Sequence, residues 1–247
     1  MFCGTIAVMF AVVEQYEYAA LFVLLGIFFD FFDGLAARML NVQSKLGLEL
    51  DSLADMVTSC VVPGIVMYQL LANSVQTTSF APSLFEKSTG LDQHQPAFDL
   101  SAEFLLPFLG IVLTLAGAYR LANFNLDERQ SDSFIGLPVP AMALFVLSLP
   151  MILLHSELKI AHDLLLNPYV LLGLVALFSY LMNAELPLFS LKFKKHGKMD
   201  IIFPVVLLII SVILIVVLQL VAIPLIILLY VFLSIAQNSL VKKSTTP

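Results

Sequence analysis

The chain has 247 residues, of which 60% are hydrophobic and only 12% are charged, and its formal net charge is −6. An apolar share of this size is far above that of a soluble domain, and a water-soluble core could not bury it. The acidic balance argues against nucleic acid as a partner. The composition therefore predicts an all-α fold, a polytopic membrane helix bundle formed by one transmembrane domain, residues 1–247.

Apolar segments recur along the chain and predict eight helical spans. The first is too short to cross a hydrocarbon layer of about 30 Å, so the chain is expected to start inside its first helix. Residues 74–102 are polar and contain turn residues, which predicts a loop. A six-helix core, about 1–184, is expected at 1–13, 19–41, 47–73, 103–122, 138–155 and 167–184, followed by an extra helix pair at 200–220 and 222–239.

Basic residues predict the orientation of the spans. In an eight-span arrangement only Lys87 and Lys159 fall on one side of the membrane. By the positive-inside rule the other side is cytoplasmic, together with both termini. The basic residues on that side are Arg38, Lys45, Arg120, Arg129, Lys192, Lys194, Lys195, Lys198, Lys242 and Lys243.

Four aspartates interrupt the second and third apolar segments, in the stretch DFFDGLAARMLNVQSKLGLELDSLAD. Asp30 and Asp33 are spaced i, i+3, and Asp51 and Asp55 are spaced i, i+4. Each pair therefore shares one face of its helix. The short turn between the segments makes the helices antiparallel neighbours, so the two pairs are expected to face each other near the cytoplasmic surface.

Four carboxylates placed together in a low dielectric repel one another unless a cation neutralises them. Oxygen ligands suit hard divalent ions such as Mg²⁺ or Mn²⁺, and one ion would leave much of the charge uncompensated. The sequence therefore predicts two divalent metal ions, an arrangement that commonly serves phosphoryl-type displacement. The alternative interpretation is a solvated acidic face at the membrane interface.

Small residues follow the same helix faces as the aspartates. Gly26, Gly34 and Ala37 form a stripe with the first aspartate pair, and Gly47 precedes the second pair at the same helical spacing. Such a stripe leaves room for a ligand against the backbone, and Arg38 is placed to meet a phosphate group. For Gly26 and Gly47 the alternative is helix packing of the small-xxx-small kind.

The motif D-x-x-D-G-x-x-A-R, followed after eight residues by G-x-x-x-D-x-x-x-D, resembles the signature of the CDP-alcohol phosphotransferase family. The resemblance implies membrane helices that transfer a phosphate-linked group from a CDP-linked donor to an alcohol and release CMP. It also implies a homodimer, two metal ions held by the aspartates, and Asp55 as the general base. By the same resemblance the nucleotide is bound by Asp33, Gly34, Ala37, Arg38 and Gly47.

Three further stretches resemble the phosphatidylserine synthases of that family: SKLGLELDSLADMVTSCVVPG (44–64), AYRLANFN (118–125) and FIGLPVPA (134–141). The similarity runs along nearly the whole chain, including the extra helix pair. It implies transfer of the phosphatidyl group from CDP-diacylglycerol to the hydroxyl of L-serine. The implied location is a bacterial or archaeal inner membrane, with membrane lipid around the protein and the active site facing the cytoplasm.

Two residues are candidates for binding serine. A serine carboxylate is held best by an arginine fork, which makes Arg120 a candidate, and Asn125 can hydrogen-bond substrate. The alternative for Arg120 is a basic residue that only reflects the orientation of the spans, and the alternative for Asn125 is a cap at the helix end.

Other functions stay open for the aspartate site. Within the family the acceptor can instead be glycerol phosphate or inositol phosphate. A divalent-cation transporter would use the same carboxylates, but such sites usually lie near the midplane between internal repeats. Here the aspartates lie near one face and no repeat is visible.

Overall fold

The computed structural model describes residues 1–42, 44–78, 102–126, 134–188 and 198–244, and every expected span coincides with a helix in these ranges. The all-α fold is confirmed, with two two-residue strands, β1 (Phe134–Ile135) and β2 (Pro187–Leu188), paired antiparallel. The helices are α1 (Phe2–Val12), α2 (Tyr16–Met39), α3 (Lys45–Asp55), the π-helix η1 (Met56–Val61), α4 (Val62–Thr78), α5 (Ala102–Leu105), the 3₁₀-helix η3 (Leu106–Ile111), α6 (Val112–Leu126), α7 (Val139–His155), α8 (Lys159–Leu165), α9 (Pro168–Asn183), α10 (Lys198–Leu218), the 3₁₀-helix η5 (Gln219–Val221) and α11 (Ala222–Ser244).

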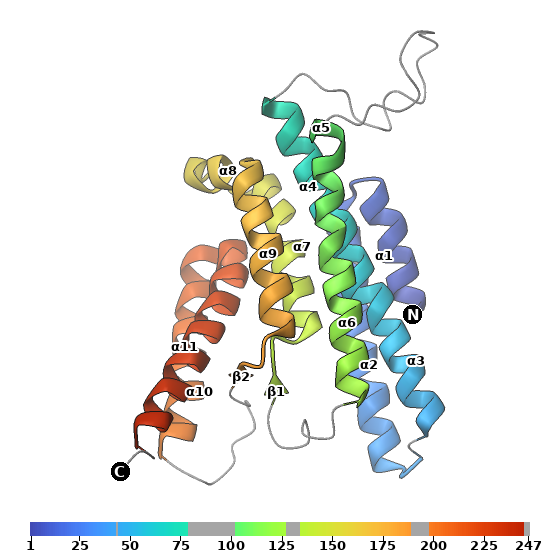
Figure 1. Ribbon diagram of the computed structural model, residues 1–247, viewed down its shortest axis with the longest axis vertical. Coiled ribbons are helices and arrows are strands. Elements are labelled where there is room, and N and C mark those ends of the chain that lie inside the picture. The colour runs from blue at the N-terminus through green and yellow to red at the C-terminus, as the bar shows by residue number, and fades with distance from the viewer. Residues whose placement is uncertain (43, 79–101, 127–133, 189–197, 245–247) are drawn as a thin grey trace.

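Four helices in the described ranges are long and apolar enough to cross a membrane, which makes the chain an integral membrane protein. One of them, Ile202–Gln237, covers most of α10 and α11, which turn back against each other (Figure 1). A fifth candidate is the pair α8 and α9, bent by 72°. Because α1 has 11 residues and α7 has 17, neither reaches a full span, and eight crossings remain a prediction.

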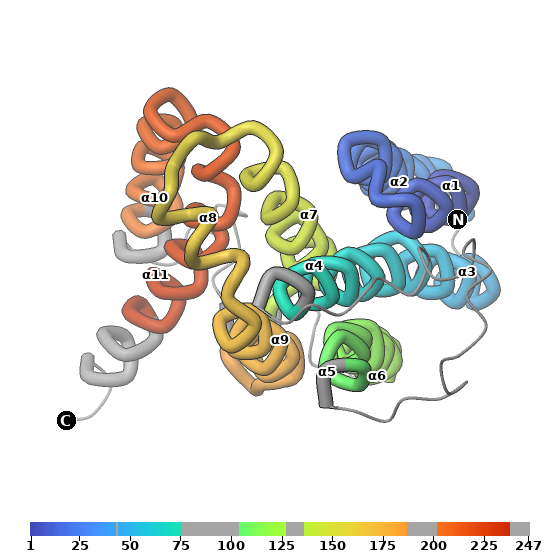
Figure 2. The backbone as a smooth tube through the Cα atoms, turned by 90° about the horizontal axis from the view of Figure 1, so that it is seen from above, coloured from blue at the N-terminus to red at the C-terminus, as the bar shows by residue number. Residues whose placement is uncertain are grey.

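The packed centre of the bundle is formed by α4 and α7 (Figure 2). The pair α1–α2 covers one side of this centre, α6 and α9 cover another, and the α10–α11 hairpin lies outside α7. Most of α7 is buried, including Met142, Phe145 and Ile152, because its apolar residues occur all round the helix. The aspartate-bearing helices α2 and α3 therefore lie at the edge of the bundle.

Tight turns bring the antiparallel helices together. Glu14, Asn41 and Gln219 have positive φ angles of 60°, 53° and 48°, and each lies one or two residues after the last residue of a helix. A left-handed residue reverses the chain within a few residues. The turn at Asn41 keeps the end of α2 and the start of α3 at one end of the bundle, the lower end in Figure 1, where α6 also ends and α10 also begins.

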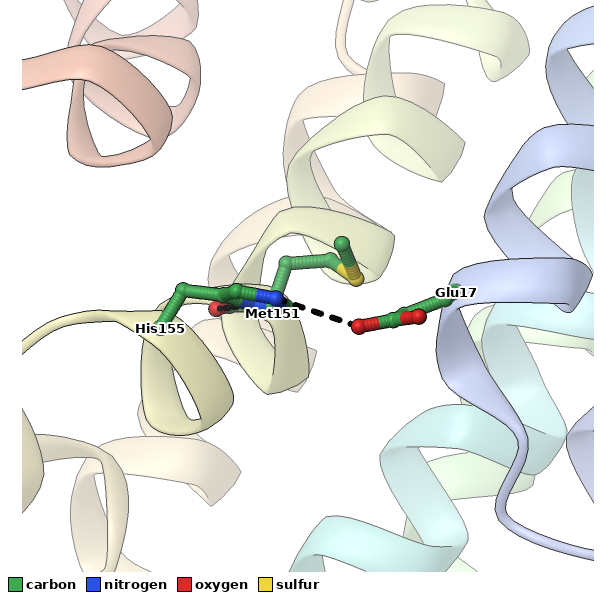
Figure 3. A network of polar contacts seen from close by, with 3 residues as sticks. All are labelled: Glu17, Met151 and His155. Atoms are coloured by element: carbon green, nitrogen blue, oxygen red, sulfur yellow. Dashed lines mark hydrogen bonds and ion pairs between the residues drawn. The ribbon is translucent and has the colours of Figure 1, made fainter.

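A polar contact joins α2 and α7 at the other end of the bundle (Figure 3). The Nε2 atom of His155 lies 3.1 Å from Oε1 of Glu17, and its Nδ1 atom lies 3.2 Å from the carbonyl oxygen of Met151. Both side chains are well exposed, so the pair contributes little stability. Its effect is to join the start of α2 to the end of α7.

The π-helix η1 directly follows Asp55 and was not predicted. The N–H of Val62 donates to the carbonyl of Val57, five residues back, and the next residue is Pro63, which has no N–H to donate. Upstream, the hydroxyl of Thr58 donates to the carbonyl of Ala54 at 2.9 Å. Short π segments often occur beside functional sites, because they shift the helix face by part of a turn.

Candidate active site

The structure brings three of the four aspartates together, from two different helices. One carboxylate oxygen each from Asp30, Asp33 and Asp51 lies within 4.8 Å of the others. Asp30 is half-buried, whereas Asp33 and Asp51 are exposed. The facing of the two aspartate pairs thus follows from the antiparallel turn between α2 and α3.

Asp55 lies one helical turn beyond Asp51, at the junction of α3 with the π-helix. It does not belong to the group of oxygens within 4.8 Å, but its carboxylate interacts electrostatically with Asp51 and Asp33. It is half-buried, in contrast to Asp51. The fourth aspartate is therefore set back from the other three, toward the packed part of the bundle.

The end of the bundle that carries the aspartates is not close-packed. The buried residues of α2 all lie in its first half, ending at Val23, and α3 has no buried residue. In α6 the last buried residue is Arg120, six residues before the helix ends. All three helices therefore extend past the core, and Asp33 and Asp51 are exposed at this end of the bundle.

Among the small residues of α2, Gly26 and Gly34 have different surroundings. A Cβ atom added at Gly26 would lie 2.8 Å from Cγ2 of Thr58, whereas one added at Gly34 would have no atom within 4 Å. Gly26 is thus a helix-packing contact, as the alternative interpretation held. Gly34 and Ala37 are half-buried on the same face as Asp30, and Gly34 leaves open space beside the cluster.

We expect the same substitution to affect stability at Gly26 and nucleotide binding at Gly34. Gly26→Ala should lower the melting temperature in detergent, since Thr58 is stiff and hydrogen-bonded, and overpacking typically costs about 1–3 kcal/mol. Gly34→Ala should leave the melting temperature unchanged and weaken nucleotide binding. Thermal melts and CDP binding on both purified variants check this, and a Gly34→Ala protein that binds CDP like wild type would contradict it.

Gly47 and Arg38 flank the turn between α2 and α3. The N–H of Gly47 donates to the Oγ atom of Ser44 at 3.0 Å, which caps the start of α3. A Cβ atom at Gly47 would lie 3.1 Å from that oxygen, so glycine permits the cap. Arg38 is exposed in the last turn of α2, where a cation interacts favourably with the helix dipole.

Arg120 joins two of the stretches singled out in the sequence. Its side chain is only 7% exposed, and it donates through Nη2 to the carbonyl of Gly136 at 3.0 Å and through Nε to the carbonyl of Leu137. Gly136 has φ +74°, and a Cβ atom there would lie 3.2 Å from the carbonyl oxygen of Ala184. AYRLANFN and FIGLPVPA are therefore in direct contact, whereas Arg129 lies outside the described residues.

Asn125, the other candidate for serine, reaches across to α3. Its Nδ2 atom lies 3.0 Å from the Oγ atom of Ser52, the residue after Asp51. Ser52 is not among the residues predicted from the sequence, because only the approach of α6 to α3 gives it a role. No pattern within α3 would have distinguished this serine from an ordinary exposed one.

Three curated relatives of the chain carry the name CDP-diacylglycerol–serine O-phosphatidyltransferase. The relative from Bacillus subtilis (strain 168) is 34% identical over 152 residues, which are 59% of this chain and 68% of the relative. The relative from Helicobacter pylori (strain J99 / ATCC 700824) is 32% identical over 148 residues, 59% of this chain and 51% of the relative. The relative from Saccharomyces cerevisiae is 34% identical over 140 residues, 53% of this chain and 40% of the relative.

The family model that matches the chain is described as CDP-alcohol phosphatidyltransferase, and it covers residues 1–183. The match includes the helices that carry the aspartates, Arg120 and Asn125, and it ends before α10. The similarity to the family therefore covers less of the chain than the sequence alone suggested, because it does not include the extra helix pair α10–α11. With the signature aspartates brought together between α2 and α3, and with most of its length matched, the chain belongs to the CDP-alcohol phosphatidyltransferase family.

Proposed function

We propose that this protein transfers the phosphatidyl group of CDP-diacylglycerol to the hydroxyl of L-serine, forming phosphatidylserine and CMP. The observation that carries the proposal is the convergence of Asp30, Asp33 and Asp51 within the family motif. The names of the relatives support serine as the acceptor.

The residues present fit a divalent cation. Three carboxylates from two helices supply only oxygen donors, which is the ligand type that Mg²⁺ and Mn²⁺ prefer. We propose that two ions bind, held by Asp30, Asp33, Asp51 and Asp55, because one ion would leave much of the negative charge uncompensated. When bound, these ions would polarise the diphosphate and offset the charge that builds up during transfer.

The open end of the bundle suits the nucleotide part of the donor. Gly34 leaves space beside the cluster, with Ala37 on the same face and Arg38 one turn further along α2. The acyl chains would remain in the lipid beside α2, whose outer surface is exposed and apolar at Phe28 and Phe32. We propose that the site lies at the cytoplasmic face of an inner membrane, where serine and the released CMP are soluble, and that the protein forms a homodimer.

The proposed transfer step uses Asp55 as the base. The carboxylate of Asp55 takes the proton of the serine hydroxyl, and the serine oxygen forms a bond to the phosphorus attached to diacylglycerol. The bond from that phosphorus to the CMP phosphate oxygen breaks, and CMP leaves with the electron pair. Asp55 suits this role because it is set back from the other three aspartates, and positioning of the reactants supplies much of the rate.

For the serine carboxylate we propose Arg120, and we expect Arg120→Lys to raise the apparent KM for serine more than that for the donor. Lysine keeps the charge but loses the planar fork that would hold the serine carboxylate through two hydrogen bonds. Initial rates at varied serine and varied donor check this. A variant with a lower melting temperature but an unchanged KM for serine would make Arg120 a purely structural residue.

The proposed function is tested by an acceptor panel. Purified protein with CDP-diacylglycerol labelled in its lipid part, and Mg²⁺ or Mn²⁺, is offered serine, glycerol phosphate or inositol phosphate, and CMP and labelled lipid are measured. CMP release only with serine supports the proposal, and release with another acceptor reassigns the substrate. Mn²⁺ uptake into proteoliposomes without any CMP release would favour a cation transporter instead.

A further inference from the structure

We propose that Asn125 and Ser52 form a positioning pair that holds α3 against α6 and thereby sets the carboxylates of Asp51 and Asp55. This inference rests on the proposed function, because it assigns the pair to the cation site of that reaction. It also gives Asn125 a different role from serine binding.

The geometry of the pair is specific. The Nδ2 atom of Asn125 lies 3.0 Å from Oγ of Ser52, and the Oδ1 atom lies 3.2 Å from the same oxygen. The hydroxyl of Ser52 also reaches the carbonyl of Leu48 at 3.2 Å. Because the hydroxyl has one hydrogen, the consistent arrangement is donation from Ser52 to Leu48 and acceptance from Asn125. The serine thus connects the backbone of α3 to the side chain on α6.

Burial supports a contact between helices at this position. In the last turn of α6 the residues beside Asn125 are exposed, including Asn123 and Leu126, whereas Asn125 is half-buried. In α3, Ser52 is half-buried between exposed Asp51 and exposed Leu53. The two residues that touch are therefore covered by each other at an otherwise open end of the bundle.

The helix α3 depends on such a contact because it has no buried residue of its own. Nearer the core, α6 is fixed to the helix that continues from α3: Thr114 donates to the carbonyl of Cys60 at 3.0 Å, and Gly117 packs against Cys60. Eight residues separate Cys60 from Ser52. The Asn125–Ser52 pair holds the far end of this helix, where Asp51 and Asp55 flank the serine.

Loss of the pair should therefore weaken cation binding and leave the binding of serine unchanged. Replacing groups that hold metal ligands in place typically reduces metal affinity by roughly 10–100-fold. We expect Asn125→Ala and Ser52→Ala each to weaken Mn²⁺ binding by about tenfold, at the lower end of that range. The double variant should bind Mn²⁺ no more weakly than either single variant, since both remove the same contact.

The experiment measures Mn²⁺ binding to the purified full chain by electron paramagnetic resonance of free Mn²⁺, without substrate. Ser52→Thr keeps the hydroxyl and should bind like wild type. Asn183→Ala is the matched control, because Asn183 also donates to the backbone of α6, at Ala116, but belongs to α9, which carries none of the four aspartates. At saturating Mn²⁺ all variants should show the wild-type KM for serine.

Wild-type Mn²⁺ affinity in Asn125→Ala would overturn the inference. A raised KM for serine at saturating Mn²⁺ would also overturn it and would return Asn125 to serine binding. If Asn125→Ala does not fold, the contrast between Ser52→Ala and Ser52→Thr gives the same decision. A wild-type protein that binds no Mn²⁺ would overturn the inference as well. A wild-type protein that binds Mn²⁺ but releases no CMP with serine would refute the proposed function alone.

Discussion

Replacing Asp33 or Asp51 by asparagine is expected to abolish CMP release while leaving the amount of protein in the membrane unchanged. Each substitution removes one of three charged oxygen donors that lie within 4.8 Å of one another. An amide keeps the shape of the side chain but not its charge, and Mg²⁺ and Mn²⁺ are held mainly by carboxylates at such sites. The loss should be at least about 100-fold, beyond the roughly 10–100-fold typical for residues that only support the ligands.

Membrane insertion should not change, because it depends on the apolar bulk of α2 and of Lys45–Val75 rather than on single polar residues. The measurements are CMP release at saturating donor and serine, and immunoblots of the membrane fraction. Asp163→Asn on α8, at the opposite end of the bundle, is the matched control and should retain full activity. Turnover near the wild-type rate in Asp33→Asn or Asp51→Asn would exclude a metal role for that aspartate.

Asp55→Asn is expected to remove turnover while sparing much of the cation and donor binding. Asp55 lies outside the three-carboxylate group, so Asp30, Asp33 and Asp51 can still hold a cation. An asparagine amide cannot accept the serine proton, and general-base catalysis typically contributes about 10²–10⁴-fold to the rate. The drop in kcat should therefore be at least of that order, and larger because Asp55 is also proposed to ligate an ion.

The measurement pairs CMP release with CDP and Mn²⁺ binding on the same preparation, at neutral pH. The pH is held there because hydroxide or serine alkoxide at high pH would bypass the base. Asp33→Asn serves as the comparison, since it should lose cation binding and turnover together. A variant that binds donor and still transfers to serine within tenfold of wild type shows that Asp55 is not the base, and the proton must then leave through water or a phosphate oxygen.

Several features of the protein were determined by the sequence alone. The positions of the helices follow from the length and composition of the apolar segments, because a helix in lipid satisfies its own backbone hydrogen bonds whatever surrounds it. The facing of Asp30 and Asp33 toward Asp51 follows from i, i+3 and i, i+4 spacing on two segments joined by a short turn. These properties are local, so spacing and composition were enough to predict them.

Only the tertiary structure decided the roles of the residues that connect distant segments. Gly26 and Gly34 look alike in sequence, and the presence of Thr58 opposite one of them separates packing from open space. Asn125 and Ser52 are 73 residues apart, and nothing in either helix predicts their hydrogen bond. Such contacts depend on how whole helices approach each other, which is set by packing along their entire length, and a periodic pattern within one helix does not contain that information.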